Sequence, residues 1–354
     1  MGSSVDSMTT TPLSQPDRPV ISTQGLTRHF TRRKSTVEAV RGLDLEVGRG
    51  ELVAFLGPNG AGKSTTLRML TTLIEPTSGT AQVAGYDVVR ERRQVRRSIG
   101  YVGQGNGAGH AQRGRDELVS QGRAFGLSRA AAYTRAEELL DAFDLTDQAM
   151  RPVSTLSGGQ RRRLDIAIGL VHTPQLLFLD EPSTGLDPQN RANLQEQVRR
   201  LHDEQDTTIV LTTHYLEEAD AIADRVVVID HGRVIADDTA AALKAGLGDL
   251  VTMAFGNEAH ATTAAWQAEV VLGSGAEVER TGTVVRVRAA RGAETAPGLV
   301  TELAWQGVPV TRLDVASATL DDVFLELTGR SLRESNDSSH EHTDDANDTE
   351  GEAA

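Results

Sequence analysis

The chain has 354 residues, a formal net charge of −14 and no cysteine. Its length predicts about two domains, and the lack of cysteine excludes disulfides and thiolate metal sites and favours a reducing compartment. The longest apolar runs are strand-sized, far below the ~20 residues of a membrane-spanning helix. We therefore expect a soluble, cytoplasmic chain that works at a membrane only by docking on another protein.

The negative charge is concentrated at one end of the chain. Residues 331–354 contain eight acids and one arginine, a net charge of −7 that is half of the total. This tail and the polar residues 1–19 hold too few large apolar side chains to form a core, so we predict that both are disordered. The remaining chain is mildly acidic without a basic face, which argues against nucleic acid as a partner.

Strand and helix patterns alternate through residues 20–245. We predict strands at residues 20–30, 37–47, 52–56, 80–83, 99–102, 175–180, 207–213 and 225–230, and helices at 65–70, 116–147, 159–171, 189–205 and 216–223. Such alternation implies a parallel sheet with helices on both faces. Ligands of these sheets bind at the carboxyl ends of the strands, and Ser64, Asp180 and His214 each follow such an end.

A glycine-rich motif follows the first of the apolar strands. It reads G-x-x-x-x-G-K-S and consists of Gly57, Pro58, Asn59, Gly60, Ala61, Gly62, Lys63 and Ser64. In such a loop backbone N–H groups surround phosphates, the lysine reaches the terminal phosphates and the serine hydroxyl binds Mg²⁺. The helix that starts near Thr65 adds its positive N-terminal end. We predict a site for ATP and Mg²⁺.

Polar side chains at three other strand ends complete the predicted chemistry. Asp180 suits a Mg²⁺ shell beside Ser64, and Glu181 suits a general base that activates the attacking water. Gln104 can contact Mg²⁺ or that water from a glycine-rich loop, and His214 can contact the γ-phosphate and Glu181.

A second motif, Leu156-Ser157-Gly158-Gly159-Gln160, opens a helix. Its hydroxyl, two small glycines and helix N-terminus form another anion-binding surface. The glycine-rich loop already surrounds the nucleotide, so we predict that this surface covers the γ-phosphate held by a second copy in a head-to-tail dimer. The following arginines, 161–163, either strengthen that interface or pair with nearby acids.

A different pattern begins near residue 246. The elements predicted at residues 251–255, 259–272, 276–280, 284–289, 294–305 and 308–315 follow the order β-α-β-β-α-β, and a closing helix covers 320–327. This order predicts a small α+β domain of ferredoxin-like, split βαβ type. We place it at residues 246–330.

Together these motifs resemble the nucleotide-binding subunit of ABC transporters, over residues 20–238. The resemblance implies an α/β fold of the P-loop ATPase type, with a mixed sheet, antiparallel N-terminal strands and a helical subdomain at about residues 105–172. It also implies an aromatic side chain that stacks on adenine, for which Phe30 is best placed, and a dimer contact at residues 185–187, which include Asp187.

Further sequence similarities point to one group within this family. Residues 211–220, 230–236 and 318–330 look like those of drug-export subunits of the daunorubicin-resistance type. That implies a separate ABC-2 permease, with this chain at the cytoplasmic face of the membrane. In one departure, the segment after Gln104, which in that group commonly resembles Thr-Gly-Arg-Glu-Asn-Leu, is here glycine-rich and runs into Arg113-Gly114-Arg115-Asp116-Glu117-Leu118.

The sequence has alternative interpretations besides drug export. A soluble ABC ATPase that acts on ribosomes or DNA usually has two cassettes, long coiled coils or zinc modules, none of which this sequence contains. A nucleotide-binding switch without hydrolysis is disfavoured by the presence of Glu181, His214 and Ser157. Export of a lipid or polysaccharide, in place of a drug, stays open.

Overall fold

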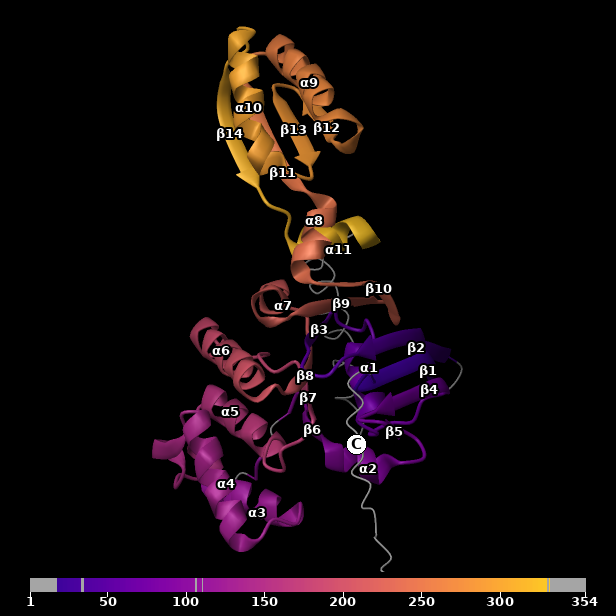
Figure 1. Cartoon of the computed structure of the whole chain (residues 1–354), viewed down its shortest axis with the longest axis vertical. Coiled ribbons are helices and arrows are strands. Elements are labelled where there is room, and N and C mark those ends of the chain that lie inside the picture. Colours follow the sequence, from indigo (N-terminus) through magenta and orange to yellow (C-terminus); the bar gives the residue numbers. More distant parts are fainter. Residues whose placement is uncertain (1–17, 33–34, 106, 110, 330, 332–354) are drawn as a thin grey trace, which may run out of the picture.

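The computed structural model describes residues 18–32, 35–105, 107–109, 111–329 and 331. Nearly all of the residues predicted to be disordered, in 1–19 and 331–354, lie outside these ranges. Figure 1 shows a larger body, which contains the first ten strands, and a smaller C-terminal module above it. Among the described residues no helix has the length and the apolar character needed to cross a bilayer.

The larger body is organised around a six-stranded sheet. Its order is β10-β9-β3-β8-β7-β6, and all neighbours are parallel except β9 and β10. The strands are β3 (Leu52–Leu56), β6 (Ile99–Val102), β7 (Leu176–Asp180), β8 (Thr208–Thr213), β9 (Arg225–Asp230) and β10 (Arg233–Asp238). Strands β3, β7 and β8 are buried along their whole length, as the continuous apolar runs predict for a sheet that is covered on both faces.

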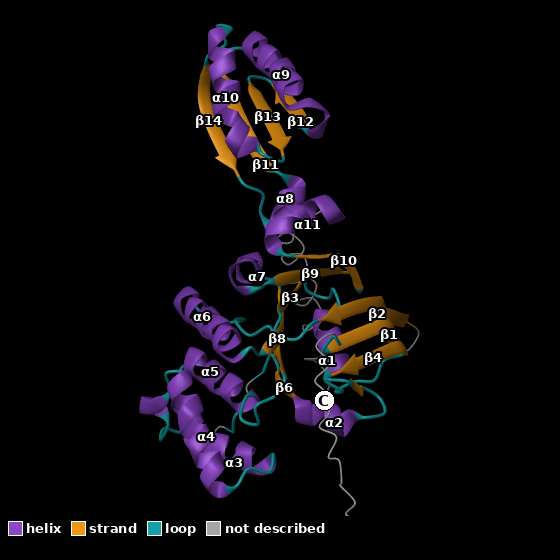
Figure 2. Ribbon diagram, viewed as in Figure 1, coloured by secondary structure: helices purple, strands orange, loops and turns teal. Residues whose placement is uncertain are grey.

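Two separate cores cover the faces of this sheet, because successive side chains of a strand point to opposite sides. Val53 and Phe55 of β3 pack into one core, and Leu52, Ala54 and Leu56 pack into the other. Figure 2 shows a smaller antiparallel sheet on the first side and helices on the second. The first side holds β1 (Ile21–Arg32), β2 (Ser35–Val47), β4 (Ser78–Val83), β5 (Tyr86–Asp87), α1 (Lys63–Leu70) and α2 (Arg92–Ser98), and the second holds α3 (Gly114–Ala124), α4 (Arg129–Ala142), α5 (Gly158–Gly169), α6 (Pro188–Gln205) and α7 (Leu216–Ile222).

The helical pattern expected over residues 116–147 forms two helices, α3 and α4. The chain turns at Gly126, whose φ of +97° lies in the region that favours glycine. Ser128 then caps the next helix, and its side chain accepts a hydrogen bond from the backbone N–H of Ala131. Gly126 and Ser128 can both be read from the sequence as a helix break. The predicted single helical stretch over residues 116–147 was therefore too long.

The C-terminal module has the predicted order of elements. It comprises β11 (Asp249–Phe255), α9 (Glu258–Leu272), β12 (Glu277–Thr281), β13 (Val284–Ala289), α10 (Gly292–Trp305) and β14 (Val310–Ala316). The sheet order is β12-β13-β11-β14, with every neighbouring pair antiparallel. This is the topology of a ferredoxin-like, split βαβ fold, and the apolar faces of β11 and β13 form a core of their own with α9 and α10.

The last helix returns the chain to the larger body. α11 (Leu320–Thr328) follows β14 and contacts α8 (Ala240–Leu247) and α7. Figure 1 shows α8 and α11 together between the two bodies. Leu320 and Phe324 are buried in the same core as α7 and the central sheet, not in that of the C-terminal module. The helix is therefore a structural part of the larger body.

Phe324→Ala should destabilise the larger body by roughly 3–5 kcal/mol, because Phe324 is fully buried and its loss leaves a cavity. Both tryptophans, Trp266 and Trp305, lie in the C-terminal module. Urea unfolding followed by far-UV circular dichroism should thus show a lowered midpoint, while the fluorescence transition moves much less. Leu325→Ala, at a half-exposed position of the same helix, should change the free energy of unfolding by less than about 0.5 kcal/mol; equal effects of the two substitutions would contradict this account of α11.

Candidate active site

The glycine-rich loop connects buried strand β3 to helix α1. Gly62 precedes the helix with φ +105°, and a Cβ atom there would lie 2.4 Å from the carbonyl oxygen of Ala39. A Cβ at Gly57 would meet the carbonyl oxygen of Ile229 at 2.1 Å. Only glycine therefore fits at these two positions, and the tight loop directs backbone N–H groups and the N-terminus of α1 into one space.

That space is a polar cavity of about 310 Å³. Two predicted residues from outside the glycine-rich loop, Gln104 and Glu181, line this cavity together with the loop. The full lining consists of Asn59, Gly60, Ala61, Gly62, Lys63, Ser64, Thr65, Gln104 and Glu181. Gly57 and Pro58 lie behind it, where their carbonyl oxygens accept hydrogen bonds from Lys63 Nζ at 2.7 and 3.0 Å. Burial lowers the pKa of Lys63 to about 8, although the carboxylates of Glu181 and Asp180 favour its charged form.

Asp180 ends β7 and is completely buried. Its Oδ1 accepts hydrogen bonds from Ser64 Oγ and Thr212 Oγ1, both at 2.8 Å, while its Oδ2 has no hydrogen-bond partner within the described part of the chain. Gln104 Nε2 donates to Ser64 Oγ at 3.3 Å. A buried carboxylate oxygen without a partner, next to a hydroxyl and a side-chain amide, is the hard oxygen environment that Mg²⁺ prefers, so these residues fit that ion.

Glu181 lies beside His214. Glu181 has φ +46°, a conformation that costs non-glycine residues of order 1 kcal/mol and clusters at functional sites. Its Oε2 accepts a hydrogen bond from Thr184 Oγ1 at 3.2 Å and lies 3.6 Å from His214 Nδ1. The neighbouring His214 is the largest influence that lowers the pKa of Glu181; burial opposes it and Lys63 reinforces it. At 3.6 Å the contact with His214 is longer than a hydrogen bond, so it is loose here.

The second glycine motif lies at the start of α5, outside the polar cavity. Ser157 caps this helix: its Oγ accepts from Gln160 N at 3.2 Å, and Gln160 Oε1 accepts from Ser157 N at 3.0 Å. Ser157 and Gly158 are exposed, whereas Gly159 is buried. A Cβ at Gly159 would lie 2.4 Å from Asn190 Oδ1, which ties the motif closely to the beginning of α6.

Two further predicted residues also lie outside the polar cavity. Asp187 caps α6 by accepting a hydrogen bond from Asn190 N at 3.0 Å. Phe30, on β1 of the small sheet, is 39% exposed, and the Arg28 guanidinium covers its ring at 4.6 Å. One face of Phe30 is thus in contact with a cation in this structure.

Arg162 is a site residue whose orientation the sequence did not reveal. It is buried, and it donates to the carbonyl oxygens of Gly103, Asp180 and Pro182 at 2.6, 3.1 and 2.8 Å. Its position in a run of three arginines predicted either a dimer-interface residue or a partner of nearby acids. The buried residues of α5 also include Leu164, Asp165 and Ala167, so they do not form a single helical stripe, and no spacing in the sequence marks Arg162 as buried.

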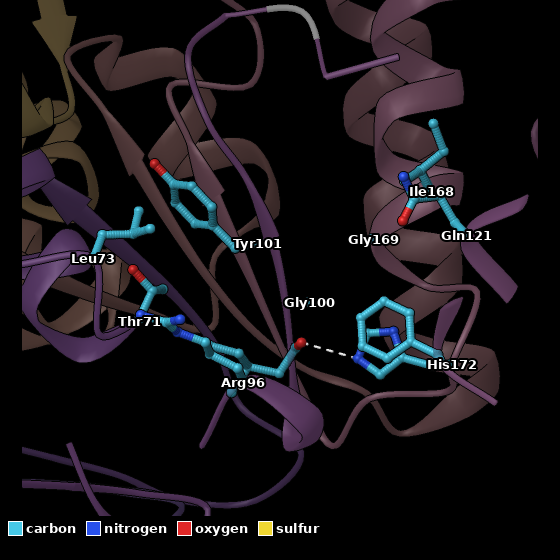
Figure 3. A pocket seen from close by; sticks show the side chains of 11 residues that line it. Thr71, Leu73, Arg96, Gly100, Tyr101, Gln121, Ile168, Gly169 and His172 are labelled. Carbon is cyan, nitrogen blue, oxygen red and sulfur yellow. Dashed lines mark hydrogen bonds between the residues drawn. The ribbon is translucent and has the colours of Figure 1, made fainter. Parts of the chain in front are cut away.

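An apolar cavity of about 250 Å³ is lined by none of the predicted site residues. Figure 3 shows the side chains that line it. It lies between the end of α1, strand β6 and helices α3 and α5. Leu73, Tyr101 and Phe125 line it; the ring of Phe125 stacks on His172 at 3.9 Å, and Leu73 and Phe125 are 53% and 44% exposed. The cavity therefore opens on a surface with exposed apolar side chains.

The similarity of this chain to known proteins points to the same family as its motifs. Residues 40–184 match the family model described as "ABC transporter". The chain is 45% identical to the daunorubicin/doxorubicin resistance ATP-binding protein of Streptomyces peucetius, over 89% of this chain and 94% of that protein. It is 34% identical to the linearmycin resistance ATP-binding protein of Bacillus subtilis, over 83% and 95% of the two chains.

A solved dimeric structure of a bacterial ABC transporter cassette superimposes with a TM-score of 0.57, at 25% identity, over 62% of this chain and 98% of the cassette. The predicted fold is confirmed by this similarity and by the sheet order. The relatives and the matched model agree with the phosphate loop and the strand-end carboxylates on one conclusion: this chain belongs to the family of ABC transporter ATP-binding proteins and is an ATPase.

Proposed function

We propose that this chain is the ATP-hydrolysing subunit of an exporter and that it powers a separate ABC-2 permease from the cytoplasmic face of the membrane. The observation that carries the proposal is the separation of two anion-binding surfaces in one chain. The phosphate loop lines the polar cavity, while the exposed Ser157 and Gly158 begin α5 outside it. Each surface needs a counterpart that only another copy supplies.

The residues of the polar cavity take distinct roles in hydrolysis. The loop N–H groups and Lys63 hold the phosphates, and Ser64, Gln104 and Asp180 hold Mg²⁺, which supplies positive charge when bound. Glu181 is the general base, since its carboxylate lines the polar cavity beside the phosphate loop. His214 contacts the γ-phosphate and orients Glu181.

The active unit is a head-to-tail dimer. Ser157, Gly158, Gly159 and Gln160 of one copy cover the γ-phosphate held by the other, and Asp187 meets its counterpart across the interface. The dimeric cassette among the similar structures supports this arrangement. Phe30 stacks on adenine once Arg28 has moved from one face of its ring.

Drugs or similar amphipathic compounds are the proposed cargo. The two relatives described above are named for resistance to daunorubicin, doxorubicin or linearmycin, and the chain covers at least 94% of the length of each. Cargo is contacted by the permease, so this chain contributes energy and not cargo recognition.

The apolar cavity of Figure 3 is the proposed contact with the permease. A subunit without a membrane helix in its described part needs such a surface. Leu73 and Phe125 expose large apolar side chains there, and β6, which lines the cavity, leads directly to Gln104. A short amphipathic segment of the permease that fills this cavity would thus touch the strand that ends at the ATP site.

Phe125→Glu tests this function in cells that produce the chain with its permease. A charge in the apolar cavity should reduce both the permease that co-purifies and the efflux of doxorubicin by at least about tenfold. Phe125 does not line the polar cavity, so ATP binding by the purified chain should persist. Val37→Glu, at an exposed apolar position on β2, is the matched control. Full co-purification and efflux with Phe125→Glu would overturn the proposed contact, and a wild-type pair that exports no drug would overturn the proposed cargo.

A further inference from the structure

The loop that follows Gln104 is held by two buried carboxylates. Asp165 of α5 is 4% exposed, and its Oδ1 accepts hydrogen bonds from the backbone N–H groups of Gly107 and Ala108 at 3.1 and 2.9 Å. Glu117 of α3 is 6% exposed, and its Oε1 accepts from Gly109 N at 3.0 Å. Both carboxylates thus replace the water that these loop amides would otherwise bind.

The glycines of this loop allow that close approach. A Cβ at Gly109 would lie 2.4 Å from Glu117 Oε1, and a Cβ at Gly107 would lie 3.3 Å from Asp165 Oδ1. The carboxylates of Asp165 and Glu117 can therefore reach the backbone N–H groups of this glycine-rich segment. A loop with so many glycines loses much conformational entropy when it is held in one conformation. These hydrogen bonds offset that entropic cost.

Side chains of helix α5 bind the backbone on both sides of Gln104 in the sequence. Arg162, one turn before Asp165, donates to the carbonyl oxygen of Gly103 at 2.6 Å, and Asp165 holds Gly107 and Ala108. Gln104 lies between these anchors and reaches Ser64 Oγ at 3.3 Å. Ser157 caps the same helix, so the second glycine motif and the anchors of Gln104 lie on one helix.

We propose that Asp165 is a positioning residue for ATP hydrolysis, which fixes the loop after Gln104 so that the Gln104 side chain stays beside Ser64. This inference rests on the proposed role of Gln104 at the Mg²⁺ site. Together with Arg162, this carboxylate links the helix that follows the second glycine motif to the segment around Gln104.

The test compares Asp165→Ala and Asp165→Asn in the full chain. Loss of two hydrogen bonds to a carboxylate should lower kcat roughly tenfold and raise the Mg²⁺ concentration at half-maximal turnover, with little change in KM for ATP because the phosphate loop is intact. Asp165→Asn keeps an acceptor oxygen and should recover most of kcat. In the nucleotide-free protein, the Gly107 and Ala108 amides should exchange hydrogen faster in Asp165→Ala. Asp141→Ala, at an exposed acid on α4, should match the wild type.

A double substitution shows whether Asp165 acts through Gln104. The Gln104→Ala/Asp165→Ala variant should be no slower than Gln104→Ala alone, because the same function is already lost. If the two effects multiply, or if Asp165→Asn is as defective as Asp165→Ala, the inference is wrong although the proposed function stands. If Gln104→Ala has wild-type kcat, the proposed role of Gln104 fails and the inference fails with it. Should Asp165→Ala not fold, Gly107→Pro removes one donor from the loop side, and its kcat and Mg²⁺ dependence decide in the same way.

Discussion

Glu181→Gln should abolish turnover and trap ATP between two copies of the chain. Glutamine preserves the size of the side chain and an acceptor for Thr184 Oγ1, so the local structure should survive. It removes the ionised carboxylate, and loss of a general base costs about 10²–10⁴ in rate. The γ-phosphate then stays intact and continues to bridge the phosphate loop of one copy and Ser157 of the other.

Gel filtration with and without ATP detects the ATP-bound dimer. We expect Glu181→Gln to elute as a dimer with ATP and Mg²⁺ and as a smaller species without them. Glu217→Gln, at an exposed acid at the start of α7, serves as the control and should retain turnover. A Glu181→Gln protein that stays monomeric at saturating ATP would count against the head-to-tail dimer, and one with normal turnover would count against the general base.

Mixing two inactive variants should restore activity. Lys63→Ala removes the buried cation of the phosphate loop, and we expect at least about a hundredfold loss of turnover from the missing phosphate charge. Ser157→Asp keeps an acceptor that caps α5, but its carboxylate repels the γ-phosphate of the facing copy. Each variant should be inactive alone, because every site in its own dimer is damaged.

In a mixed dimer one of the two sites combines an intact Lys63 with an intact Ser157. Random pairing gives half mixed dimers, so about a quarter of all sites should be intact. The measurement is steady-state ATPase activity across mixing ratios, with a maximum expected near equal amounts. Ser157→Asn, a neutral cap, separates loss of the hydroxyl from the effect of charge. Activity that never exceeds that of the parents would show that the two motifs do not share a site.

The phosphate site could be predicted from the sequence because its chemistry is local. Residues 57–64 form one contiguous motif whose glycines and lysine are recognisable without knowledge of the fold, although the contacts that require glycine at Gly57 and Gly62 come from the distant residues Ile229 and Ala39. The strand ends near Asp180 and His214 follow from apolar runs. The order of elements in the C-terminal module also followed from short alternating patterns, and the sheet order confirms it.

Side-chain direction was harder to predict. Arg162 and Asp165 are charged, and charged residues are rarely buried, so neither of the two roles predicted for the arginine run, a dimer interface or pairing with acids, placed Arg162 inside the molecule. Their burial depends on carbonyl and N–H groups contributed by segments about 20 and 60 residues away in the chain, which no local pattern contains. Thr212, which binds Asp180 and Glu181 from the neighbouring strand, was overlooked for the same reason, since it sits within an apolar strand.

The return of α11 to the larger body has a consequence for how the protein is made. The ribosome releases the N-terminal part first, and domains generally begin to fold in that order. Leu320 and Phe324, however, belong to the core that surrounds the central sheet, and they emerge only after the entire C-terminal module. The core around the central sheet therefore lacks these two side chains until the entire C-terminal module has been synthesised, so that module can fold before the larger body is complete.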